Sequence, residues 1–261
     1  MQGKDEAEGK EEVRKPGIKI KGETMEDYCV IDLEMTGLNA KHHKILEAAA
    51  VRVRGKQVAA TFSRLIRPDM PLEQELTELT GITNEMVKDA PSEEEVLTEY
   101  FAFLGEDVLV GQNVIFDYGF LKQAAVNRKQ TFERSAVDTL KIARRCLTNL
   151  EKKNLESLCD YYGIEMEHHH RALEDAVATQ VLYERLEREF GAVQPDIFVP
   201  KPLIYKAKRQ TPATARQKKH LKELADYHKI DLNLAWDTLT RNEASRQVDK
   251  IISRYGRMPR N

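Results

Sequence analysis

Two acidic residues at the end of an apolar stretch are the first candidates for chemistry in this sequence. The segment 29–33 runs from small and apolar residues into Asp32, and Glu34 follows two positions later. Side chains alternate along a β-strand, so both carboxylates leave one face about 7 Å apart, and Gly37 supplies a turn that ends the strand. Neighbouring acids repel unless a cation lies between them, and all-oxygen ligation favours Mg²⁺ or Mn²⁺. The alternative is a solvated strand end.

Two further acids stand where they can join the first pair. Asp117 lies at the start of a predicted helix that follows a short apolar strand. Asp175 lies in the first turns of the last long helix of the main body, five residues after His170. Taken singly, Asp117 is explained by a favourable charge near a helix N-terminus, and Asp175 by a solvated helix face. Their weight comes from the combination with Asp32 and Glu34.

The elements that must position these acids follow from the hydrophobic pattern. Arg54-Gly55-Lys56 separates two β-rich runs and predicts a hairpin, and Ser92 with Glu95 forms a capping box that opens a helix. Strands are expected at about 28–34, 45–53, 57–66, 108–111 and 136–138. Helices are expected at about 72–79, 84–88, 92–104, 113–125, up to 145, 154–163 and 171–190. Early strands followed by interleaved helices indicate an α/β domain.

The chain divides into four segments by composition. Residues 1–24 are a mixed-charge, aromatic-free run that is expected to be disordered. The main domain is expected at 25–191, and residues 192–213, with four prolines, are expected to be a semi-extended linker. Residues 214–261 are expected to form a small basic helical module.

Composition excludes several classes of protein. The 261 residues contain 32% charged and 41% apolar residues, which is typical of a soluble globular protein. No apolar run reaches the roughly 18 residues that a membrane span needs, and the N-terminus does not have the apolar core of a secretory signal. The three cysteines have no C-x-x-C spacing, so we expect reduced thiols in a cytoplasmic protein.

The charge is divided unevenly between the main body and the C-terminal part. Residues 201–261 hold 15 Lys and Arg against 6 Asp and Glu, whereas the chain as a whole has a net charge of −2. Thr240 with Glu243 forms a second capping box, and Trp236 is a candidate core residue between two amphipathic helices. We expect the module to hold a nucleic-acid backbone; the alternative is that its basic residues only solvate a docking helix pair.

Three ordered motifs identify a family resemblance. Asp32-x-Glu34 on a first strand, then N-x-x-F-D-x-x-F-L from Asn113, then H-x-A-x-x-D from His170 resemble the DEDDh (DnaQ-like) 3′–5′ exonucleases. The resemblance covers about residues 27–190, and Glu47 and the segment 82–87 also fit the family's usual pattern. It is greatest to the proofreading exonuclease domain of Gram-positive replicative polymerases. It implies a ribonuclease H-like fold with a mixed five-stranded sheet and helices on both sides.

The resemblance also implies roles for individual residues. Asp32, Glu34, Asp117 and Asp175 would bind two Mg²⁺ or Mn²⁺ ions, and His170 would be the general base. The run 168–170 invites a metal-cluster interpretation, but only His170 has an Asp five residues later. We therefore assign a role to His170 alone and treat His168 and His169 as solvated loop residues.

The same resemblance implies contacts to the terminal nucleotide. They would come from Met35, Thr36 and Leu38 after the first acids, with Leu38 wedged beside the last base, and from Asn113 and Phe120. Core packing is the alternative for Leu38 and Phe120. Most of the family has Thr at the position of Met35, and Ile-Asp-Leu-Glu-Met-Thr-Gly-Leu is the first motif of oligoribonuclease.

The sequence therefore predicts a metal-dependent 3′–5′ exonuclease. Its substrate would be the 3′ end of single-stranded nucleic acid, with DNA favoured and RNA left open, and its products nucleoside 5′-monophosphates. A polymerase or another replication or repair protein is the expected partner. The alternatives are an oligoribonuclease-like enzyme that degrades small RNA and a non-catalytic polymerase-accessory protein that binds nucleic acid.

Overall fold

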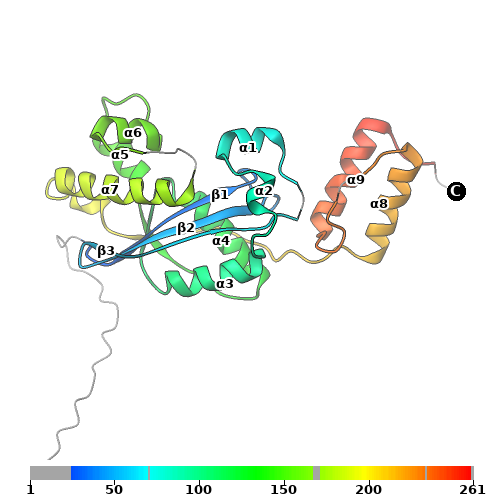
Figure 1. Cartoon of the computed structure of the whole chain (residues 1–261), viewed down its shortest axis with the longest axis horizontal. Helices are drawn as coiled ribbons and strands as arrows, with labels where there is room; N and C mark the ends of the chain where they lie inside the picture. Colours follow the sequence, from blue (N-terminus) through cyan, green and yellow to red (C-terminus); the bar gives the residue numbers. More distant parts are fainter. Residues whose placement is uncertain (1–24, 70, 167–170, 233, 260–261) are drawn as a thin grey trace, which may run out of the picture.

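The computed structural model describes residues 25–69, 71–166, 171–232 and 234–259, and a mixed six-stranded sheet lies at its centre (Figure 1). The order along the sheet is β3-β2-β1-β4-β5-β6. The β1–β4 and β4–β5 pairs are parallel and the other pairs are antiparallel. The strands are β1 (Tyr28–Met35), β2 (Ile45–Arg54), β3 (Gln57–Leu65), β4 (Leu109–Gly111), β5 (Ser135–Asp138) and β6 (Lys201–Pro202).

The α/β class, the hairpin and the mixed sheet are confirmed, but the expected number of five strands is wrong. The sixth strand, β6, pairs antiparallel with β5 through Lys201 and Pro202. It lies inside the segment that its prolines predicted to be a linker. Proline cannot donate a ladder hydrogen bond and is tolerated on an outer strand, so two residues of this kind give no strand pattern in the sequence.

Helices cover both faces of the sheet (Figure 1). Cys29, Ile31 and Leu33 of β1 pack in one core cluster with side chains of α3 and α4. Tyr28 and Val30 of the same strand pack in a second cluster with α5, α6 and α7. The helices of the domain are α1 (Gln74–Thr80), α2 (Asn84–Val87), α3 (Glu93–Leu104), α4 (Ile115–Asn127), α5 (Thr139–Cys146), α6 (Leu155–Tyr162) and α7 (Ala172–Phe190).

Two helices begin later than the sequence pattern predicts. The capping box of Ser92 and Glu95 at the start of α3 is present as expected. In contrast, α1 begins two residues late because the Asn84 side chain binds both backbone groups of Leu72. The start of α4 is also delayed by two residues, since Asn113 adopts a left-handed φ of 60° that a helix cannot contain.

Beyond the sheet, two helices that run parallel to each other, α8 (Ala215–His228) and α9 (Arg241–Tyr255), pack around their own apolar cluster. Buried Leu221, Leu224 and Ile251 form its centre, and Trp236 packs against it as a half-buried side chain. The capping box of Thr240 and Glu243 is present. Among the described residues, no helix is long and apolar enough to cross a membrane.

Candidate metal centre and active site

The alternation of β1 determines where the first acids point. Cys29, Ile31 and Leu33 fill the core on the α4 side of the sheet, so Asp32 and Glu34 extend from the opposite face, which α7 covers. Both carboxylates are half-buried. A strand that is apolar on one face therefore presents two acids to a helix on the other.

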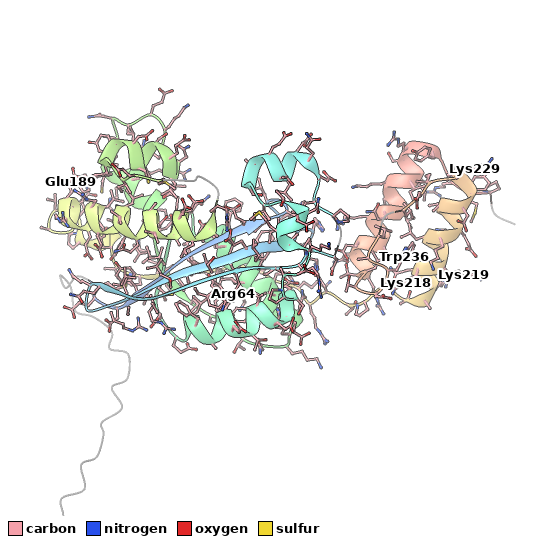
Figure 2. The ribbon with its side chains drawn as sticks, in the orientation of Figure 1. Arg64, Glu189, Lys218, Lys219, Lys229 and Trp236 are labelled. Atoms are coloured by element: carbon pink, nitrogen blue, oxygen red, sulfur yellow. The ribbon has the colours of Figure 1, made fainter. Side chains whose placement is uncertain are left out.

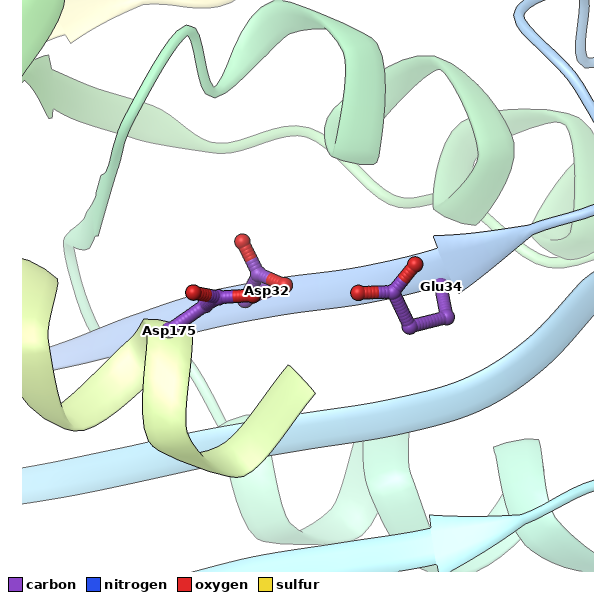
Figure 3. A group of neighbouring side chains, drawn as sticks. All are labelled: Asp32, Glu34 and Asp175. Atoms are coloured by element: carbon purple, nitrogen blue, oxygen red, sulfur yellow. The ribbon is translucent and has the colours of Figure 1, made fainter. Parts of the chain in front are cut away.

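Asp175 meets these acids from the first turn of α7 and is buried. One carboxylate oxygen from each of Asp32, Glu34 and Asp175 can be chosen so that all lie within 4.8 Å of one another. In Figure 3 the Asp175 side chain points from α7 to Asp32, and Glu34 lies further along the same strand. The structure thus brings together Glu34 and Asp175, which are 141 positions apart in the chain.

Asp117 approaches β1 from α4 and is buried. The parallel strand β4 ends at Gly111, which leaves the Leu33 N–H of β1 without a strand partner on that side. That N–H donates to Asp117 Oδ1 at 3.0 Å. Asp117 is not one of the three residues whose oxygens meet within 4.8 Å, but its charge raises the pKa of Asp32.

The electrostatics of the site are those of an acid cluster without enough positive charge. Burial, followed by the charges of Asp117 and Asp175, raises the pKa of Asp32 well above its usual value. Burial and the charges of Asp175 and Glu47 raise the pKa of Glu34 to about 8. Burial also raises the pKa of Asp117 to about 7, although the backbone N–H bonds that this carboxylate accepts oppose the shift.

The three acids whose oxygens meet fit a divalent cation with oxygen ligands. Ligands of a Mg²⁺ ion lie about 2.0–2.1 Å from it, so two oxygens on one ion are at most about 4 Å apart. The 4.8 Å grouping is close to this spacing and needs only small side-chain adjustments. Bound cations would also offset the repulsion that, after burial, raises the pKa values of Asp32 and Glu34.

An ion pair that the sequence did not reveal anchors the start of α7. Arg171 donates from Nε and Nη2 to the two carboxylate oxygens of Glu47 on β2, at 3.1 Å each. The Ala172 N–H donates to the same carboxylate at 3.3 Å. Glu47 is buried and lies directly opposite Glu34 in the β1–β2 register. The sequence signals are an acid at position 47 within the otherwise apolar run 45–51 and its fit to the family's usual pattern, and neither identifies Arg171 as its partner.

The histidine that the resemblance assigns as general base lies outside the described residues. This holds for His170 and also for His168 and His169. The described chain resumes at Arg171, which the bidentate bond to Glu47 holds against β2. The role of His170 therefore remains a proposal.

The residues after the first acids form a short loop. Thr36 donates its N–H to Lys44 O at 2.9 Å, and its hydroxyl accepts from the Lys44 N–H at 3.0 Å. Leu38 projects from this loop and is 79% exposed, which fits a wedge against a base better than core packing. Met35 is half-buried and packs against the core on the α4 side.

The two candidates from the second motif differ in their surroundings. Asn113 is half-buried, and its N–H donates to Asp138 Oδ1 at 3.1 Å. Phe120 is 4% exposed and belongs to the core cluster on the α4 side, which agrees with the alternative, core packing, and its contact to substrate stays a prediction. Phe116, which the sequence reasoning did not select, is 42% exposed one residue before Asp117.

Comparison with known proteins places this geometry in a family. The model of a family described as exonuclease, RNase T, matches residues 29–183. A PolC-type DNA polymerase III from Latilactobacillus sakei is 42% identical over 164 residues, which is 62% of this chain and 11% of the polymerase. The corresponding polymerase from Caldanaerobacter subterraneus is 37% identical over 160 residues, 61% of this chain and 11% of its own.

Solved structures give the same fold. Exonuclease X in complex with 5′ overhanging duplex DNA is 28% identical, with a TM-score of 0.53 over 66% of this chain and 99% of its own. The nuclease domain of 3′hExo, a DEDDh family member bound to rAMP, is 19% identical with a TM-score of 0.55, over 69% of this chain and 98% of its own. At that identity the second likeness concerns the fold alone. The ribonuclease H-like fold expected from the motifs is confirmed.

Proposed function

Because this chain belongs to the exonuclease family whose model matches residues 29–183, we propose that it is a 3′–5′ exonuclease that removes nucleoside 5′-monophosphates from single-stranded nucleic acid with the help of divalent cations. The observation that carries the proposal is the meeting of Asp32, Glu34 and Asp175 within 4.8 Å. A protein that only binds nucleic acid would gain nothing from acids gathered where phosphates must lie, because carboxylates and phosphates repel one another.

The side chains have separate tasks in this reaction. Asp32, Glu34, Asp117 and Asp175 would hold two cations, Mg²⁺ or Mn²⁺. Bound cations of this kind lower the pKa of an attacking water and stabilise the leaving oxygen. His170 would accept the proton of that water, a task that suits a reference pKa of about 6.5. Glu47 and Arg171 hold the start of α7, and with it Asp175, against β2.

The terminal nucleotide would lie against the loop after β1. Leu38, with 79% of its side chain exposed, is the residue that can contact the last base, and the backbone of Thr36 is within the same loop. Phe116 offers a second exposed apolar surface at the start of α4. An apolar wedge does not distinguish sequences, which suits an enzyme that degrades any 3′ end.

DNA is the favoured substrate, because the polymerase relatives are 37–42% identical over the catalytic region. The motif with Met35, shared with oligoribonuclease, keeps degradation of short RNA as a second candidate. The chain covers only 11% of the length of those polymerases, so association with a polymerase or another replication or repair protein, in the cytoplasm, is part of the proposal.

A degradation time course on matched DNA and RNA single strands tests the proposal. With Mg²⁺ or Mn²⁺ we expect cleavage of both and faster cleavage of DNA, and EDTA should stop both reactions. Faster cleavage of di- and trinucleotide RNA than of any DNA would favour the oligoribonuclease-like activity. Binding without cleavage in every metal would favour the non-catalytic accessory protein.

A further inference from the structure

The C-terminal helices α8 and α9 form a parallel pair with fixed geometry, which we call the helix pair. Thr214 and Gln217 form a capping box at the start of α8, in addition to that at the start of α9. The Ala213 N–H donates to Leu239 O at 2.7 Å, and Pro212 and Thr240 form an isolated β-bridge. These bonds join the entry of α8 to the entry of α9, so surface side chains on the two helices keep a defined arrangement.

The segment 203–210 attaches this helix pair to α4. The ring of Tyr205 lies against Gly119, where a Cβ atom would come within 3.0 Å of it. The Gln123 side chain donates to Lys208 O at 2.9 Å, and the Gln210 N–H donates to Asn127 Oδ1 at 2.9 Å. The segment that composition predicted to be a linker is therefore bound along a helix of the catalytic domain.

Two contacts place the helix pair at one particular edge of the sheet. Gln210 Nε2 donates to Lys41 O at 2.7 Å, and Thr238 Oγ1 donates to Asp69 Oδ2 at 3.0 Å. Lys41 lies in the loop after β1, and Asp69 follows the end of β3. Since β1 and β3 both end at this edge, the helix pair adjoins the end of β1 that carries Glu34 (Figure 1).

Basic side chains follow the same route from α4 to the helix pair. Lys206, Lys208 and Arg209 are exposed on the attached segment, and residues 201–210 contain no acid. Lys218 and Lys222 continue along α8, one helical turn apart. We call these five residues the basic track. In the part of the chain that the structure describes, none of them pairs with a carboxylate, whereas the neighbouring Lys219 pairs with Glu223 at 3.7 Å.

One aromatic side chain lies beside this track, and two others lie at the far ends of α8 and α9. The Nζ of Lys222 lies 4.9 Å from the ring centroid of Trp236, and Figure 2 shows Trp236 close to the end of α8 that carries Lys218. At the other end of the helix pair, where both helices end, Tyr227 and Tyr255 are 52% and 46% exposed, and the ring of each contacts that of His228. Basic residues that follow a backbone, with exposed rings on which bases can stack, are the features of single-strand binding surfaces.

We propose that the basic track and the two tyrosines bind the single strand upstream of the 3′ end that occupies the active site. This proposal rests on the proposed exonuclease function, because that function places the 3′ end in the active site and the upstream part of the strand toward the helix pair. Phosphates would contact the five basic side chains, and bases further from the 3′ end would stack on Tyr227 or Tyr255. A strand of a few nucleotides would not reach the helix pair.

Equilibrium binding of a 20-nucleotide DNA tests the proposal. The full chain carries Asp32→Asn, so that the DNA is not cleaved during the titration. The track variant carries Lys206→Gln, Lys218→Gln and Lys222→Gln in addition. Each lost phosphate contact lowers the salt slope of single-strand binding by about 0.7, so we expect the slope to fall by about 2 and the affinity in low salt to fall about tenfold. Tyr227→Ala with Tyr255→Ala should instead lower the affinity at least about fivefold with an unchanged slope.

A matched control removes the same charge elsewhere. Lys152, Arg185 and Arg188 are exposed residues on or near α6 and α7, and their replacement by Gln together should change neither the slope nor the affinity by more than twofold. Equal losses of affinity in the control and the track variant, or no loss in either, would overturn the proposal and leave the helix pair as a surface for a protein partner.

Cleavage with Asp32 restored separates this proposal from the proposed function. The ratio of kcat/KM for the 20-nucleotide strand to that for a trinucleotide should fall about tenfold in the track variant. An unchanged ratio would refute the track even if the enzyme is active. In contrast, absence of cleavage by the unaltered chain would refute the exonuclease proposal, while the binding titration would still report on the track.

Discussion

Replacing Asp32 by Asn should stabilise the metal-free protein at alkaline pH and make it insensitive to Mg²⁺. Asp32 shares a site with Glu34 and Asp175, and the oxygens of the three lie within 4.8 Å of one another. At an effective dielectric constant of about 20, two unit charges about 4.8 Å apart repel by about 3.5 kcal/mol. The variant has one negative charge fewer in this cluster.

The sign of the pH dependence follows from the raised pKa values. A carboxyl group with a raised pKa keeps its proton in the folded state after the unfolded chain has released it. The free energy of unfolding therefore falls as pH rises from the unfolded-state pKa, about 4, through the folded-state pKa, by about 1.4 kcal/mol per pH unit and proton. The pKa of Glu34, about 8, places this loss between pH 4 and 8.

The expected gain is smaller than the full Coulomb energy, because retained protons already relieve part of the repulsion. We expect the Asn variant to be more stable than the unaltered chain by about 2 kcal/mol at pH 8 in EDTA, and equal to it within about 0.5 kcal/mol at pH 5. For a domain of this size that is a difference of about 4–8 °C in Tm at pH 8.

Thermal unfolding followed by circular dichroism at pH 5 and pH 8 measures both differences. Addition of Mg²⁺ should raise the Tm of the unaltered chain and leave that of the variant nearly unchanged, since binding stabilises only the folded state that binds. Asp160→Asn, at an exposed acid on α6, is the control and should follow the unaltered chain. A variant less stable than the unaltered chain at pH 8 in EDTA, or an equal response of both to Mg²⁺, would refute the reasoning.

Four other substitutions test the neighbouring residues. Glu47→Gln should lower the free energy of unfolding by about 3 kcal/mol in urea titrations, because it leaves Arg171 with a neutral partner at a buried site; a change below 0.5 kcal/mol would show that the pair does not hold α7. His170→Ala should lower kcat by about 10²–10⁴-fold while Mn²⁺ binding, measured by calorimetry, is kept, and His168→Ala should lower kcat less than threefold; equal losses would point to a shared role. Leu38→Ala should change Tm by less than about 2 °C, since the side chain is exposed, yet raise KM for a single strand several-fold; an unchanged KM would remove Leu38 from the binding surface.

Local patterns predicted most of the elements. The break at residues 54–56 identified the hairpin of β2 and β3, and the pair Ser92 and Glu95 identified the start of α3. Each of these signals lies within a few residues of the feature that it specifies. The same is true of the alternation in β1, which determines that Asp32 and Glu34 share a face.

Long-range contacts account for what the sequence did not show. The bond from the Leu33 N–H to Asp117 spans 84 residues and depends on the early end of β4. The pairing of Glu47 with Arg171 spans 124 residues. Neither contact has a local pattern, because Asp117, Glu47 and Arg171 each look like an ordinary charge in the sequence, and the Leu33 contact is made by a backbone N–H. The strand β6 was missed for a different reason, since two residues are too few for alternation.

The phosphodiester bond that is broken first gives the most direct test of the exonuclease proposal. One single-stranded DNA is labelled at its 5′ end in one reaction and at its 3′ end in another, and both are followed with Mg²⁺ and with EDTA. We expect the 5′ label to pass through a ladder of strands that shorten one nucleotide at a time, while the 3′ label is released at once as a mononucleotide, and both only with Mg²⁺. Internal cuts, release of the 5′ label first, or equal cleavage in EDTA would contradict a metal-dependent 3′–5′ exonuclease.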